Sequence, residues 1–158
     1  MRTDFRRKPN RLSGFDYSTP NAYFVTICTA DKRMIFNNSE TVSESVERLK
    51  TSAERLGFQI IAYCFMPDHV HLLVDASESK CDLIKFIKRF KQKTGYEFKK
   101  KRGLTLWQRS FYDHILRSEE SLIKKARYIF NNPVRKGLVE DFREYPFLGS
   151  RVFDIDEI

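Results

Sequence analysis

Apolar positions along the chain recur with the two periods expected of strands and helices. Aromatic and β-branched runs bounded by turn residues predict strands at 22–29, 58–65, 66–74 and 111–116. Apolar residues that recur every three or four positions predict two amphipathic helices. The buried face of the first is formed by Val42, Val46, Leu49, Ala53 and Leu56. The buried face of the second is formed by Leu83, Ile87, Phe90 and Thr94. The second helix is expected to end near Gly95, with the basic run up to Gly103 as a loop.

A third helix is predicted after Ser118, a suitable N-cap, and Pro133 is expected to end it. The elements then follow one another as strand, helix, strand, strand, helix, strand and an additional helix. This order matches an α+β fold of the ferredoxin-like βαββαβ type, in which helices cover one face of an antiparallel sheet. The other face is expected to be free, and the additional C-terminal helix is attached to this core. His69 and His71 could open onto the free face or onto a groove beside the terminal helix, and the sequence does not decide between the two.

Charge and pattern divide the 158 residues into three parts. Residues 1–20 are expected to form a basic N-terminal arm, residues 21–139 a single domain, and residues 140–158 an acidic C-terminal tail. There is no secretory signal and no run of about 18 apolar residues, so neither secretion nor a membrane span is expected. Three cysteines without metal-ligand spacing favour a reducing cytoplasm.

Positive charge gathers in one stretch. The net charge is +8 and the sequence pI is about 9.5, and nine Lys or Arg residues lie between Lys85 and Arg102 against the single acid Glu97. Such clustering favours a nucleic-acid partner over ordinary solvated surface. A basic patch for a membrane surface would need a lipid signal, and the sequence has none.

Two of the three histidines, His69 and His71, lie two residues apart in the strand predicted at 66–74. Because side chains alternate along a strand, both imidazoles point to one face while Val70, Leu72 and Val74 point to the core. Converging imidazoles can hold a metal ion. Taken alone, however, such a pair is more often two polar residues on the wet face of a sheet.

Tyr128 and Asn132 are one helical turn apart on the third helix and share a face. If that face looks toward the histidines, a metal held by His69, His71 and the Asn132 amide oxygen would leave positions for phosphate oxygens. Tyr128 would then place its hydroxyl beside the phosphorus. On spacing alone, a half-buried helix aromatic remains the better interpretation of Tyr128.

Three motifs together resemble a known family. They are Met66-Pro67-Asp68-His69-Val70-His71, Trp107-Gln108-Arg109-Ser110-Phe111-Tyr112-Asp113-His114, and Tyr128-Ile129-Phe130-Asn131-Asn132-Pro133-Val134-Arg135-Lys136-Gly137-Leu138. In this order they are similar to the REP-associated tyrosine transposases, bacterial single-tyrosine relatives of the smallest insertion-sequence transposases within the His-hydrophobic-His endonuclease superfamily. The similarity extends from about Tyr23 to Leu138.

The resemblance implies a ferredoxin-like fold and cleavage of single-stranded DNA near a hairpin, with a 5′-phosphotyrosyl intermediate. It implies that His69 and His71 are metal ligands, that Tyr128 is the nucleophile, and that the enzyme works in the bacterial cytoplasm, on the nucleoid when bound to DNA. Asn132 stands where insertion-sequence relatives have glutamine, so its ligand role is a weaker expectation. Mg²⁺ or Mn²⁺ suits such a mixed nitrogen and oxygen site. Relatives include both dimers and monomers, so a homodimer and a monomer both stay open.

Basic residues are the expected contacts to DNA phosphates. The candidates are Arg6, Arg7, Lys8, Lys85, Lys88, Arg89, Lys91, Arg109 and Arg127. His114 is expected to be structural or to support a metal ligand, and the ring of Tyr112 to pack in the protein. Two other functions stay open: a non-catalytic nucleic-acid-binding domain, and a metal phosphodiesterase that activates water.

Overall fold

The computed structural model describes residues 21–76 and 81–158; the predicted arm with Arg6, Arg7 and Lys8 lies outside the described residues. The strands are β1 (Ala22–Cys28), β2 (Phe58–Met66), β3 (His69–Ala76), β4 (Tyr112–Leu116) and β5 (Leu148–Gly149). The helices are α1 (Ser39–Leu56), α2 (Leu83–Arg102), α3 (Glu119–Phe130) and α4 (Asn132–Arg135), with short 3₁₀ turns η1 (Ala30–Lys32), η2 (Ile35–Asn37), η3 (Phe142–Glu144) and η4 (Ile155–Glu157).

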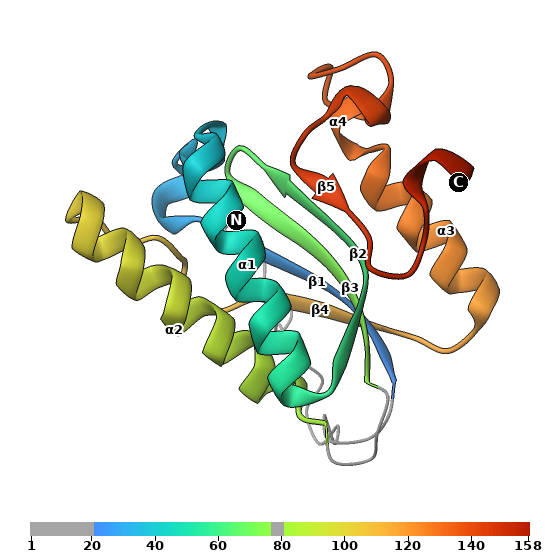
Figure 1. The fold of residues 1–158 in the computed structure, drawn as a ribbon, viewed down its shortest axis with the longest axis horizontal. Helices are drawn as coiled ribbons and strands as arrows, with labels where there is room; N and C mark the ends of the chain where they lie inside the picture. Colours follow the sequence, from blue (N-terminus) through green and yellow to red (C-terminus); the bar gives the residue numbers. More distant parts are fainter. Residues whose placement is uncertain (1–20, 77–80) are drawn as a thin grey trace, which may run out of the picture.

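The strands form one antiparallel sheet in the order β4-β1-β3-β2-β5. The first four strands and helices α1 and α2 give the ferredoxin-like βαββαβ arrangement, so the predicted fold class is confirmed (Figure 1). Strand β1 pairs with β3 in a register that places Thr26 beside His71 and Cys28 beside His69. This register fixes which side chains surround the histidines.

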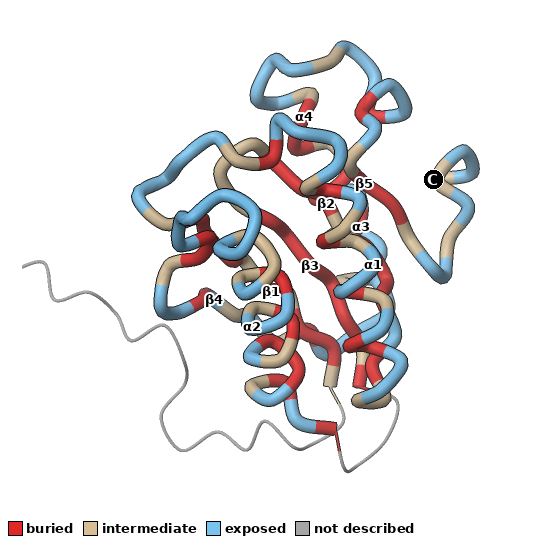
Figure 2. Tube along the Cα trace, turned by 60° about the vertical axis from the view of Figure 1, so that its left-hand side comes forward, coloured by how far each residue is buried: buried red, intermediate tan, exposed pale blue. Residues whose placement is uncertain are grey.

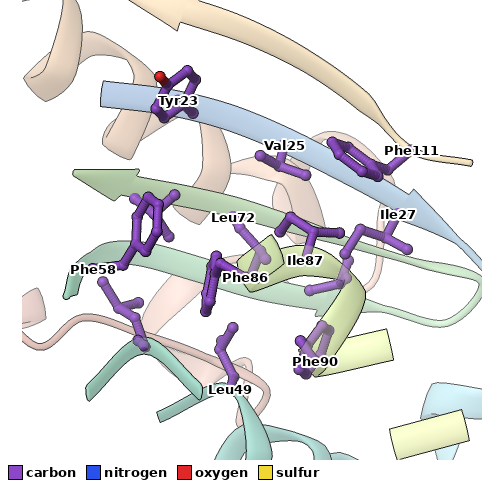
Figure 3. Close-up of a cluster of buried hydrophobic side chains, with 14 of the residues drawn as sticks. Tyr23, Val25, Ile27, Leu49, Phe58, Leu72, Phe86, Ile87, Phe90 and Phe111 are labelled. Carbon is purple, nitrogen blue, oxygen red and sulfur yellow. The ribbon is translucent and has the colours of Figure 1, made fainter. Parts of the chain in front are cut away.

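Helices α1 and α2 cover one face of the sheet, which we call the first face. Figure 3 shows Phe86, Ile87 and Phe90 of α2 packed against apolar side chains of the sheet, and all three are fully buried. Val70, Leu72 and Val74 of β3 belong to the same cluster, as the alternation predicted. In Figure 2 the strands are mostly buried, whereas the outer turns of both helices are exposed.

The opposite, second face of the sheet is not free, contrary to the prediction. Helix α3 packs on it through Ala126, Ile129 and Phe130, which contact a cluster that includes Cys64 and Leu73 of the sheet. Both faces of β3 are therefore covered, because its apolar residues occur on both (Figure 1).

The segment predicted as an acidic tail also packs on the second face. Phe142, Tyr145 and Leu148 are buried there, and the Tyr145 hydroxyl donates a hydrogen bond of 2.5 Å to the Phe65 carbonyl. β5 pairs with β2 at the edge of the sheet. The acidic residues of this segment predicted a tail, but the apolar residues between them pack on the sheet and determine its position.

Helix α2 continues seven residues beyond its predicted end at Gly95 and finishes at Arg102. Lysine and arginine are good helix formers, and one glycine inside a helix costs only about 1 kcal/mol relative to alanine. The real stop is Gly103, a C-cap residue in the left-handed conformation with φ of 70°. The basic run at 99–102 is therefore helical and not a loop.

Candidate active site

His69 and His71 lie at the start of β3, directly after the turn formed by Pro67 and Asp68. Both side chains point to the second face, as the alternation predicted, and their Nε2 atoms are 3.1 Å apart. The two imidazoles meet at a steep angle of 75°. The Nε2 atoms of the two histidines therefore meet on the second face of the sheet.

The other ring nitrogen of each histidine is held by the protein. His69 Nδ1 lies 2.6 Å from Asp68 Oδ1, and His71 Nδ1 lies 2.9 Å from Thr26 Oγ1 on the neighbouring strand. Partners of this kind fix the ring orientation and the tautomer of metal-binding histidines. The two Nε2 atoms are therefore the ring nitrogens that could bind a metal ion.

His71 is a buried residue with 9% of its surface exposed, so it does not lie on a wet surface as the sequence suggested. Burial, reinforced by the positive charges of His69, Arg135, Lys125 and Lys136, lowers the pKa of His71 from 6.5 to about 3. The ring is therefore neutral at physiological pH. A neutral imidazole is the form that binds metal ions.

Tyr128 lies near the end of α3, with its ring edge toward the rings of Phe24 and His71 at centroid distances of 6.2 and 6.5 Å. Two cations flank the ring: the Lys125 ammonium at 4.8 Å and the Arg135 guanidinium at 3.9 Å from its centroid. The side chain is 46% exposed. Tyr128 is therefore a half-exposed tyrosine whose ring lies beside that of His71.

Asn132 does not continue the helix of Tyr128 as predicted. Helix α3 ends at Phe130, and Asn132 begins the short helix α4 with Pro133 in its first turn. Arg135 connects the two residues: it donates hydrogen bonds to the Tyr128 carbonyl at 3.0 Å and to Asn132 Oδ1 at 3.2 Å. Tyr128 and Asn132 are thus held in one local unit.

The Asn132 amide is buried, at 3% exposure, and its Nδ2 has no hydrogen-bond partner in the part of the chain that the structure describes. Among the same residues, the side chain of Asn132 forms no hydrogen bond to either imidazole. The structure therefore brings Tyr128 to His71, and Arg135 links Asn132 to the Tyr128 carbonyl.

The donor set suits a cation with open positions. Two ligands at adjacent corners of an octahedral Mg²⁺ site, each at about 2.1 Å, are about 3 Å apart, and the two Nε2 atoms have this spacing. Residues 21–76 and 81–158 contain no group of three His, Cys, Asp or Glu side chains that could hold a metal. The further ligands would have to be the Asn132 amide oxygen, water or phosphate.

The other predicted site residues are dispersed. His114 is exposed on β4, paired with Phe24 on the second face, and does not contact the site histidines. Tyr112 is 53% exposed, so its ring does not pack as predicted. It is on the edge strand, in register with Thr26, and the apolar cluster of the second face reaches β4 at Leu116 but does not include Tyr112.

The basic candidates lie on both sides of the sheet. Lys85 and Lys88 are exposed and Arg89 is partly exposed on α2, which covers the first face. Lys91 donates hydrogen bonds to the carbonyls of Gln108 and Arg109 at 2.7 and 3.1 Å, so its ammonium is used within the protein. Arg109 is exposed beside α2, whereas Arg127 on α3 lines a groove with Asp154 and Glu157.

Sequence reasoning missed the residues that orient the site. Thr26, Asp68, Lys125 and Arg135 hold or flank the histidines and Tyr128. Thr26 could be found only from the pairing of β1 with β3. Arg135 lies inside the third motif, seven residues after Tyr128, but only the break in the helix after Phe130 brings it back to the Tyr128 ring.

A ferredoxin-like sheet with two imidazoles facing a tyrosine on an additional helix is the arrangement that the resemblance implied. The family model described as "Transposase IS200 like" matches residues 19–132. The chain therefore belongs to the family of IS200-like transposases. The predicted class of enzyme, a transposase, is confirmed by this match and by the relatives.

Two curated relatives carry the more specific name. A Haemophilus influenzae protein whose name places it among the REP-associated tyrosine transposases is 29% identical over 143 residues, covering 84% of this chain and 81% of its own length. The REP-associated tyrosine transposase of Escherichia coli is 29% identical over 91 residues, covering 57% of this chain and 53% of its own. The predicted resemblance to this family is thus confirmed.

A solved REP-associated tyrosine transposase bound to a REP hairpin shares the fold. It superposes with a TM-score of 0.73 at 22% identity and covers 87% of this chain and 81% of its own. In the described part of the present chain, no helix has the length and apolar character needed to cross a membrane.

Proposed function

We propose that this chain is a metal-dependent single-stranded DNA endonuclease and strand transferase that uses Tyr128 as its nucleophile. The observation that carries the proposal is the position of the exposed Tyr128 ring beside the converging Nε2 atoms of His69 and His71. The substrate would be hairpin or palindromic repeat DNA, because a relative with the same fold was solved with a REP hairpin.

His69, His71 and the Asn132 amide oxygen would hold Mg²⁺ or Mn²⁺, which when bound supplies Lewis-acid polarisation of the scissile phosphate. The protein's own residues prepare this site. Asp68 and Thr26 orient the imidazoles, and burial keeps His71 neutral. Arg135 and Lys125 place positive charge against the Tyr128 ring, where a phosphate group would approach.

In the proposed step, the Tyr128 oxygen forms a bond to phosphorus while the bond from phosphorus to the 3′ oxygen breaks. The phenolic proton leaves to solvent, which reaches the half-exposed side chain, and the departing 3′ oxygen takes up a proton. The product is a 5′-phosphotyrosyl ester. A free 3′-hydroxyl can attack the phosphorus of this ester and release Tyr128, which is the reverse of the cleavage step. Strands can therefore be joined without ATP.

The test is covalent capture of DNA. Hairpin oligonucleotides taken from repeats that flank the gene are labelled at either end and incubated with the protein and Mn²⁺, followed by denaturing electrophoresis. The 3′-labelled DNA should stay attached to the protein, the 5′-labelled piece should be released, and EDTA should prevent both.

Tyr128→Phe should lose the adduct and keep DNA binding, whereas the matched variant Tyr112→Phe should still form it. A phosphotyrosyl peptide containing Tyr112 would show that the nucleophile is wrongly assigned. Cleavage without an adduct would select a phosphodiesterase that activates water. Binding without any cleavage would select a non-catalytic nucleic-acid-binding domain.

A further inference from the structure

A groove of about 570 Å³ lies between helix α2 and the segment that leads from α2 into β4. Residues 84, 88, 91, 92, 95 and 99 line one side of it and form a single stripe along α2; residues 105–109 and 111 line the other. The groove belongs to the first face of the sheet, so it is separate from the histidines and Tyr128.

The charge of this groove is not neutralised by the protein. No Asp or Glu lines it, and Lys88, Lys99 and Arg109 form no ion pair with the rest of the described chain. The side of α2 that faces α1 is different, because Arg48 pairs with Glu97 and Lys101 pairs with Glu44. Free cations therefore gather on the groove side of α2.

The groove also has an apolar floor and unused amides. Leu106, Trp107 and Phe111 line it with little exposed surface of their own. The side chains of Gln92 and Gln108 stand at the groove and, among the residues described, make no hydrogen bond. Apolar surface, free amides and unpaired cations together suit a ligand with a base and a phosphate.

Gly95 is a glycine inside α2 that packing within the protein does not require. It lies inside α2, where glycine is unfavourable, yet a Cβ at this position would meet only Trp107 Cδ1, at an ordinary 3.7 Å. Packing within the protein therefore does not require glycine here. Gly95 lines the groove, so its missing side chain leaves room for a ligand against the helix.

The chain connects the groove to the proposed active site. The backbone N–H of Gln108 donates a hydrogen bond of 2.9 Å to the Cys28 carbonyl, and Cys28 is in register with His69. The exposed Tyr112 follows on the edge strand β4, in register with Thr26 and, through it, with His71. With strands about 4.8 Å apart, Tyr112 is about 10 Å across the sheet from His71.

We propose that this groove binds unpaired nucleotides of the DNA strand that enters the active site, with the strand passing around the edge of β4 at Tyr112. The proposal deepens the proposed function and rests on it for the identity of the ligand as DNA. Lys88, Lys99 and Arg109 contact phosphates, and Gln92 and Gln108 face base edges. Pockets of roughly 300–1,000 Å³ hold single small molecules, so a groove of about 570 Å³ has the size to take individual nucleotides of an unpaired strand.

The experiment measures binding apart from cleavage. Full-length Tyr128→Phe protein in EDTA is titrated into two fluorescent probes, a mixed-sequence single strand of 12 nucleotides and a blunt hairpin without unpaired ends. Lys88→Gln combined with Lys99→Gln should weaken single-strand binding at least tenfold and lower the salt slope by about 0.7 for each phosphate that is no longer neutralised. The blunt hairpin should lose less than twofold.

Lys93→Gln combined with Lys100→Gln is the matched control, because it removes the same two charges from α2 outside the groove. It should change neither probe by more than twofold. Gly95→Ala tests the space itself: it should raise the melting temperature, since alanine favours helices, and weaken single-strand binding at least fivefold.

Two results would overturn the groove proposal. One is equal loss of single-strand affinity for the Lys93→Gln, Lys100→Gln control and the lysine variant of the groove, and the other is equal loss of affinity for both probes. Neither bears on the covalent adduct, whose formation tests the proposed chemistry separately.

Discussion

The two faces of the sheet bury polar groups in different ways. On the first face, buried hydroxyls serve the protein itself: Thr94 donates to the Phe90 carbonyl and accepts from the Trp107 indole. On the second face, the buried Asn132 amide has an Nδ2 without a hydrogen-bond partner among the described residues, and the Nε2 of buried His71 meets the Nε2 of His69. The first face is therefore a core whose polar groups bond within the protein, whereas the second is a core that includes the residues of the proposed active site.

The coverings of the two faces differ as well. Two long helices, α1 and α2, cover the first face, whereas α3 and the irregular segment after α4 cover the second. A single helix leaves the Tyr128 side open beside β4, where Tyr112 and His114 are exposed. In the proposed function, this incomplete cover would give DNA access to the buried His71.

The largest expected effect is on the free energy of unfolding, when two phenylalanines on opposite faces of the sheet are each replaced by alanine. Phe86→Ala removes a fully buried ring from the first face and should lower the free energy of unfolding by about 3–5 kcal/mol. Phe24→Ala should cost clearly less, because Phe24 is only partly buried, yet it should impair adduct formation because its ring stacks on His71 at 5.3 Å. Urea unfolding and the covalent assay measure the two effects.

Equal losses of stability in the two variants would break the distinction between the faces. If Phe86→Ala fails to fold, Phe86→Leu keeps most of the apolar surface and should show the same order at smaller size.

The sequence predicted the first face well and the second face poorly, for a physical reason. Helical periodicity in 39–56 and 83–94 reports burial against one surface, and α1 and α2 follow it. Strand β2 is apolar at nearly every position, which signals cover on both faces, but the free face was inferred from the element order. The histidine and tyrosine positions came from motifs, whereas Thr26 and Arg135 depend on strand register and on the break after Phe130.

The second face should be sensitive to polar changes that leave its packing intact. Thr26→Val keeps the shape of the side chain but removes the hydroxyl that holds His71 Nδ1. We expect a 10–100-fold loss of Mn²⁺ affinity, the usual effect of losing such a supporting partner. Isothermal titration measures it, with Thr51→Val on the exposed side of α1 as the control. Unchanged affinity in Thr26→Val would separate Thr26 from the metal site.

The second face also contains a thiol that resists ionisation. Burial raises the pKa of Cys64, which is beside His71 in the sheet, above its usual value. The folded protein therefore keeps a proton that the unfolded chain loses above about pH 9, so stability is full below that pH and falls as pH rises. Between pH 9 and 10 the loss should be about 1 kcal/mol for this group. Urea unfolding of Cys64→Ala should show a smaller pH dependence; an identical slope would exclude the thiol as its source.

The smallest expected effects compare the caps of α2 and α3. Asp82 Oδ1 accepts a hydrogen bond from the Lys85 amide, and Ser118 Oγ accepts one from the Ser121 amide. Replacing either cap with alanine should cost about 1 kcal/mol. Helix α2 is held by the fully buried Phe86 and Phe90. Asp82→Ala should therefore lower the global free energy of unfolding, while hydrogen exchange of the α2 backbone amides stays slow. Ser118→Ala should instead speed hydrogen exchange mainly in the first turn of α3, since the residues there are exposed or only partly buried. Equal local exchange in the two helices would mean that the second face is covered as firmly as the first.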